Sequence, residues 1–205
     1  VGHYLKMKIS TDIQNGLNVV FNESKLNYVD IFQDKVEVLL DCLCMNESKE
    51  FPEDSRIKVI FRPYGRIAIS YRKGEWDNEE AEVVQIDQNN LKDYFSNLKL
   101  DSMYGWEFIN LHEQDFNKWS DKLSLDKRIE NDWRSMNTID LFAEQNGEDP
   151  VTIDVRIWFD DLEIFDYDSH PMTIQQFIDS GQRGWDQLYN TGVESKEHKN
   201  YKMKK

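Results

Sequence analysis

The densest group of side chains that could carry out chemistry lies in the stretch FDDLEIFDYDSHP, residues 159–171. Asp166, Asp168 and His170 alternate along it, so they would project to one side of an extended chain. Carboxylate oxygens at alternate positions are suitable ligands for Ca²⁺ or Mg²⁺. The spacing therefore defines a candidate metal site, and it allows a metal-dependent hydrolase that uses the acidic residues around 160–170.

The same stretch is also typical of a turn, because Asp, Ser and Pro are common turn residues. It lacks the glycine and the final glutamate of an EF-hand loop. Elsewhere the sequence contains no serine elbow, phosphate loop, dinucleotide fingerprint or H-E-x-x-H motif. We favour the turn, and we expect no cofactor and no catalytic centre.

Tryptophan offers a second kind of candidate, because it is enriched at binding hot spots. Most of the six tryptophans are expected in the core. Trp158 is different, since strand alternation places it beside Arg156 and opposite the apolar residues. We expect a second layer to cover Trp158, and exposure as a binding anchor is the alternative. Trp133 lies in the polar stretch IENDWRSMN, so Trp158, Arg156 and Trp133 form the candidate binding set.

The elements that position these residues follow from periodicity. Apolar and polar side chains alternate over residues 151–159, and Asp160 and Asp161 mark a reversal, which predicts a hairpin over 151–165 with one buried face. Downstream, apolar side chains recur every three or four positions, as in a helix. Thr173 followed by Gln176 forms a capping box. We therefore predict a helix over 173–191 that packs on this hairpin.

Further hairpins are predicted upstream, where extended runs are separated by short connections: 26–32 with 36–45, and 57–61 with 67–71. Asn15-Gly16 reads as a turn before a short strand over 17–21. Short connections force antiparallel pairing. The predicted fold is α+β, with one large mostly antiparallel sheet or two stacked sheets built from hairpins, and helices near 89–98 and 173–191.

One globular domain is expected over residues 1–193, followed by a flexible basic tail over 194–205, because no long linker interrupts the chain. Residues 57–98 and 151–189 both give a hairpin, an acidic loop and a helix in that order. A duplicated pair of halves is therefore a hypothesis, which superposition of the two segments would test.

The charge is strongly negative and unevenly distributed. The chain carries a net charge of −14, although residues 194–205 hold five lysines and only two glutamates. So acidic a body repels phosphate backbones, and we expect it to bind no nucleic acid. It favours a basic partner, and the alternative is that the charge serves solubility alone.

Composition indicates a folded protein of the cytoplasm. Hydrophobic residues make up 39% and aromatic residues 13% of the chain, enough for a core. Apolar runs are far shorter than a membrane span, and the amino terminus has no signal-peptide pattern. Cys42 and Cys44 would share one strand face, a geometry poorly suited to a disulfide, so we expect buried, reduced thiols.

The sequence resembles known proteins in composition only. Bacterial immunity proteins, which neutralise cationic toxins, share its acidic and compact character, and the resemblance carries over no residue. We therefore expect a cytoplasmic binding protein, immunity-protein-like at best, that presents an acidic surface to a basic protein partner. The metal-dependent hydrolase is the alternative, and the sequence leaves the oligomeric state open.

Overall fold

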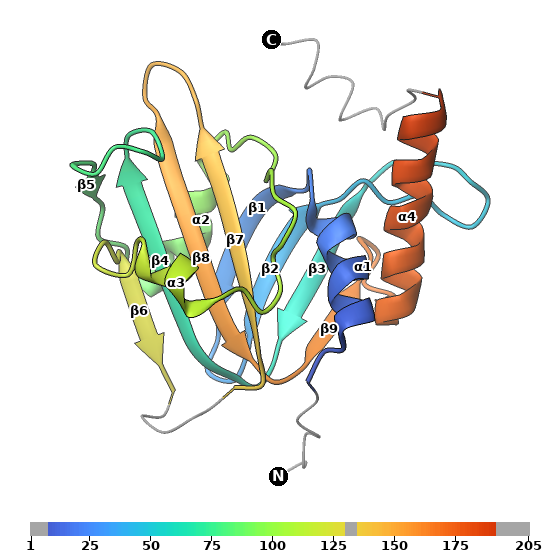
Figure 1. Cartoon of the computed structure of the whole chain (residues 1–205), viewed down its shortest axis with the longest axis horizontal. Coiled ribbons are helices and arrows are strands. Elements are labelled where there is room, and N and C mark those ends of the chain that lie inside the picture. Colours follow the sequence, from blue (N-terminus) through green and yellow to red (C-terminus); the bar gives the residue numbers. More distant parts are fainter. Residues whose placement is uncertain (1–7, 130–134, 192–205) are drawn as a thin grey trace.

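The computed structural model describes residues 8–129 and 135–191, which form two antiparallel sheets and four α-helices (Figure 1). The first sheet has the order β1 (Lys25–Ile31), β2 (Val36–Asp41), β3 (Arg56–Phe61), β9 (Leu162–Phe165) and β10 (Pro171–Met172). The second has the order β5 (Glu82–Val83), β4 (Tyr64–Lys73), β8 (Val151–Phe159) and β7 (Asn137–Gln145), and β6 (Leu125–Arg128) also pairs with β4. The predicted α+β class is confirmed.

Two of the predicted hairpins do not form. β3 pairs with β2 and β9, whereas β4 pairs with β8, so the chain crosses between sheets at Arg62-Pro63. β8 and β9 likewise lie in different sheets, and the hairpin predicted over 151–165 is wrong for the same reason. Arg62 N donates to Asp161 O, and Asp160 N donates to Pro63 O, both at 3.0 Å. The turn residues therefore bend the chain between layers, and the two crossings are hydrogen-bonded to each other.

The strand orders of the two sheets correspond. The order β2-β3-β9-β10 of the first sheet corresponds to the order β7-β8-β4-β5 of the second, whereas β1 and β6 have no counterpart among the described strands. In each segment a two-residue strand follows the crossing and precedes a helix, α2 (Leu91–Ser96) or α4 (Ile174–Thr191). This order is what duplicated halves require, and the duplication stays a prediction until the segments are superposed.

The helices near 89–98 and 173–191 are confirmed as α2, which follows a short 3-10 turn, and α4. The capping box of α4 forms as predicted. Gln176 N donates to Thr173 Oγ1 at 3.1 Å, and Thr173 N donates to Gln176 Oε1 at 2.8 Å. These bonds satisfy backbone donors that a helix leaves open at its start.

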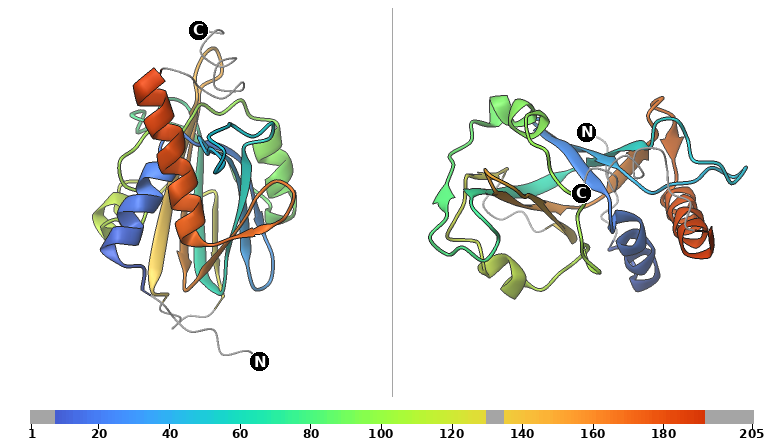
Figure 2. Two further views of the ribbon diagram at one scale, coloured as in Figure 1. Left: turned by 90° about the vertical axis from the view of Figure 1, so that its right-hand side faces the viewer. Right: turned by 90° about the horizontal axis from the view of Figure 1, so that it is seen from above.

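The strand predicted over 17–21 is wrong, because these residues belong to α1 (Thr11–Phe21). Ser10 caps this helix by accepting from Ile13 N. Gly16 lies inside the helix, and a Cβ there would come within 2.7 Å of Ile178 on α4. Glycine therefore serves the close approach of α1 and α4, which lie side by side in Figure 2, and it does not mark a turn.

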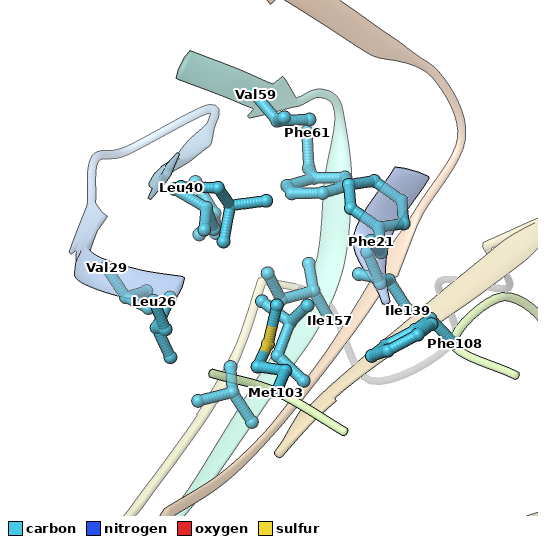
Figure 3. Close-up of a cluster of buried hydrophobic side chains, with 14 of the residues drawn as sticks. Phe21, Leu26, Val29, Leu40, Val59, Phe61, Met103, Phe108, Ile139 and Ile157 are labelled. Carbon is cyan, nitrogen blue, oxygen red and sulfur yellow. The ribbon is translucent and has the colours of Figure 1, made fainter. Parts of the chain in front are cut away.

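Side chains from both sheets, α1 and the segment 100–109 meet in one buried cluster (Figure 3). The Phe21 ring packs edge-on against Phe108 and Phe177, with centroids 6.0 and 5.9 Å apart. Cys42 and Cys44 are buried as free thiols. Among the described helices, none has the length and apolar character to cross a membrane. The predicted basic tail over 194–205 lies outside the described residues.

Candidate functional site

Trp158 and Arg156 lie on the outer face of the second sheet, on its strand β8. Arg156 is only 1% exposed, and its Nη2 donates to Leu111 O at 2.9 Å. Trp158 is half-buried, with the Phe116 ring 5.1 Å away and the Arg66 guanidinium 4.6 Å from its ring centroid. The segment that carries α3 (Glu113–Asn117) covers both, as expected for a second layer. Trp133 lies outside the described residues.

The acidic side chains nearest to Arg156 lie beyond hydrogen-bonding distance of its guanidinium group. Its Nε lies 3.6 Å from Asp140 Oδ2 and its Nη1 lies 3.7 Å from Glu113 Oε2, and neither nitrogen makes a hydrogen bond. Burial raises the pKa of Asp140 from 3.8 to about 7, although Arg156 opposes the shift. Burial likewise raises the pKa of Asp154 to about 6 against the effect of Arg72, to which Asp154 is paired. The sheet face thus holds two carboxyl groups that exchange protons near neutral pH.

Both carboxyl groups line a cleft of about 280 Å³ beneath the segment 104–119, here called the carboxylate cleft. Its other charged residues are Glu107, Asp115 and Lys118, and Lys118 is paired with Asp115 at 2.8 Å. No histidine, cysteine or serine is among the described residues that line it. The cleft therefore offers acceptors for a cationic or hydroxyl group and has no nucleophile beside its acids.

The predicted metal ligands lie in the loop between β9 and β10. Asp166 Oδ1 accepts from His170 N at 2.8 Å, and Asp166 Oδ2 lies 3.2 Å from His170 Nδ1. Ser169 has a φ of 65°, as a tight turn requires. Asp168 does not complete a cluster with them, since no three acidic, histidine or cysteine side chains in the described part of the chain group closely enough to hold a metal. These contacts are those of a turn, and the hydrolase stays an untested prediction.

Three exposed aromatic residues were not singled out by sequence reasoning. Tyr104 and Trp106 are each 70% exposed and Tyr189 is 74% exposed. The rings of Tyr104 and Trp106 meet edge-on at 6.4 Å, and we call this pair the aromatic ridge. The segment 104–111 forms no strand, and within it only Ile109 makes a bridge. The one signal in the sequence is Gly105 between the two rings, because glycine weakens a strand.

A groove of about 410 Å³ opens beside the ridge, between α1, α4 and the segment 105–109. We call it the aromatic groove, and its lining residues are Asn15, Asn18, Val19, Asn22, Trp106, Glu107, Gln182, Trp185 and Tyr189. The three α1 residues and the C-cap Asn22 share one helical face, since their spacing is three or four residues. The groove and the carboxylate cleft share Glu107, so the ridge separates two neighbouring depressions.

Comparison of the chain with protein-family models, curated proteins and solved structures gives no match.

Proposed function

We propose that this chain is a binding protein without catalytic activity, and that its docking face for a basic partner protein consists of the aromatic ridge and the two depressions beside it. The observation that carries the proposal is the exposure of Tyr104 and Trp106 between them. Large exposed aromatic side chains that are flanked by acceptors are typical anchors of protein interfaces.

Charge supports a basic partner. The two depressions are lined by four acidic residues and one lysine. Asp115 is paired with Lys118 and Asp154 with Arg72, and Asp140 lies 3.6 Å from Arg156. Glu107 is the acidic residue among them that makes no ion pair in the described part of the chain, and the whole chain carries a net charge of −14. Such a field speeds the approach of a cationic protein and rejects an anionic one.

The test uses the basic proteins encoded beside this chain in its genome, because proteins that act on each other are often encoded together. Binding is measured by isothermal titration calorimetry at increasing NaCl. We expect the affinity for the partner to fall at least tenfold between 50 and 500 mM salt, since electrostatic attraction is screened over about 10 Å at 0.1 M.

Tyr104→Ala tests the docking face, and Trp76→Ala is its control, because Trp76 is 65% exposed on the loop after β4. We expect Tyr104→Ala to weaken binding about tenfold, the effect of a hot-spot side chain. We expect Trp76→Ala to leave it unchanged, because Trp76 lines neither of the two depressions. Equal losses in the two variants, or no basic protein that binds, would refute the proposal.

A further inference from the structure

The aromatic groove is held in shape before any partner arrives. Asn18 Oδ1 accepts from Phe108 N at 2.9 Å, and Asn22 Oδ1 accepts from Gly105 N at 3.2 Å, so α1 fixes the segment that carries Trp106 and Glu107. On the opposite wall the Trp185 indole donates to Val19 O at 2.8 Å. A site whose walls are fixed in this way loses little conformational entropy on binding.

Three aromatic rings line this groove, and two of them are stacked. The centroids of Trp185 and Tyr189 are 5.6 Å apart with an interplanar angle of 29°, and Trp106 belongs to the segment opposite them. The face of an aromatic ring attracts a cation through its quadrupole, most strongly in tryptophan. Among the described residues that line the groove, Glu107 is the only charged one. The lining therefore combines ring faces with one negative charge.

Several other rings of the chain already have a cation of the chain over them, although among the described residues the exposed rings of Trp76 and Tyr104 do not. Arg56 lies over Tyr167 at 4.3 Å, Lys92 over Tyr28 at 4.5 Å, and Arg66 over Trp158 at 4.6 Å. Within residues 8–129 and 135–191, no lysine or arginine lies over Trp106, Trp185 or Tyr189. The chain thus supplies its own cations to rings elsewhere and leaves those of the groove without one.

We propose that the aromatic groove is a cage for one cationic side chain, a lysine or an arginine, of the basic partner protein. The cation lies against the rings of Trp106 and Tyr189, with the buried Trp185 ring stacked on Tyr189, and the Glu107 carboxylate balances its charge. The inference rests on the proposed function and specifies which chemical group of the partner enters this groove. A neutral sugar would also stack on aromatic rings and donate hydrogen bonds to Glu107, whereas a cation is attracted by its charge to both the rings and the carboxylate.

The test follows the indole N–H signals of the protein by ¹⁵N NMR during titration with Nα-acetyl-lysine methylamide. The matched probe carries an acetyl group on Nζ, which removes the charge and keeps the chain length. We expect saturable shifts of the Trp106 and Trp185 signals with the charged probe and at least fivefold weaker binding of the acetylated one. The Trp76 signal serves as an internal control and should not move.

Two exposed substitutions complete the test. Trp106→Leu should abolish probe binding, and Glu107→Gln should weaken it three- to tenfold while the folded spectrum is retained. Equal binding of the charged and acetylated probes, binding of methyl glucoside in place of lysine, or no shift at Trp106 would overturn the cage. If residues 194–205 must be deleted before the probe binds, the groove belongs to the chain's own tail and the proposal is likewise overturned.

The two proposals fail in different ways. Suppose that a basic partner binds with steep salt dependence and loses affinity in Tyr104→Ala, but is unaffected by Trp106→Leu and Glu107→Gln. The docking face would then be supported and the cage refuted. Tyr104 lines the carboxylate cleft and not the aromatic groove, so these variants report on separate parts of the face.

Discussion

Arg156 and Asp140 show how a sheet face can hold charge at low exposure. Arginine and aspartate are almost never fully buried unless they are paired, and here the closest approach is 3.6 Å, beyond a hydrogen bond. Burial therefore raises the pKa of the Asp140 carboxyl group, which retains its proton to higher pH. Because the pKa values of Asp140 and Asp154 are raised toward neutrality, these two residues make the stability of the fold depend on pH in this range.

Asp140→Asn should flatten the dependence of stability on pH. With a pKa of about 7 in the folded chain and 3.8 otherwise, Asp140 stabilises the fold while it is protonated, and this stability is lost as pH rises through 7. The free energy of unfolding of the native chain should fall by up to roughly 4 kcal/mol from pH 4 to pH 7 through this group. Urea unfolding at pH 5, 6, 7 and 8 measures it.

The slope between pH 5 and pH 7 is the quantity to compare, because replacing the carboxyl group by an amide also changes stability by an amount that does not depend on pH. Asp154 remains and retains part of the slope in the variant. Parallel curves for the native chain and Asp140→Asn would contradict the buried, protonated state.

At the scale of elements, close contacts of α4 decide the geometry of the aromatic groove. α4 carries Gln182, Trp185 and Tyr189 into the groove, while α1 carries the asparagines opposite them. Gly184 lies on the side of α4 that meets the loop after β2, where a Cβ would come within 2.2 Å of Leu43 O. The position of the helix, and with it the width of the groove, depends on the absence of a side chain at this point.

Gly184→Ala should lower the free energy of unfolding by about 2 kcal/mol, because the overpacking cost exceeds the gain in helix propensity of about 1 kcal/mol. Gln175→Ala, at an exposed position of the same helix, is the control and should change stability by less than about 0.5 kcal/mol. Urea unfolding of both variants gives the comparison. A more stable Gly184→Ala protein would show that α4 is not held this closely.

For the whole molecule, charge repulsion should oppose the compact state. The net charge of −14 remains after every lysine and arginine has been counted. Most of the ion pairs between described residues are partly exposed and contribute little stability. Salt therefore weakens repulsion more than it weakens attraction.

The chain is also a candidate duplication in which two crossings at Pro63 and Asp160 join the sheets.

Raising NaCl from 10 to 200 mM should raise the melting temperature by a few degrees, since the screening length falls from about 30 Å to below 10 Å. Circular dichroism on heating measures the change, and sucrose at equal osmolality controls for solute exclusion. A lower melting temperature in salt would mean that attractive pairs outweigh the net charge.

Local sequence patterns predict several of the secondary-structure elements of this protein. The capping box of α4 and the β1-β2 hairpin depend on neighbours in the chain, and both appear in the structure. The single buried face expected over residues 151–159 does not, because both faces of β8 are covered. α1 was missed because Gly16 reads as a turn unless Ile178 of a distant helix is known to lie against it. The exposed residues Tyr104 and Trp106 were missed for a related reason, since alternation gives the two faces of a strand and not which of them is covered.

The sequence by itself determined the class of fold, the acidic character and the positions of most strands and helices, because periodicity and charge belong to the chain alone. Only the tertiary structure decided that two expected hairpins are crossings between sheets, that α3 covers Trp158, and that Trp106 lies open beside a groove. A proline or aspartate bends a chain equally well within a sheet or between two, and the choice depends on long-range partners that no local pattern contains.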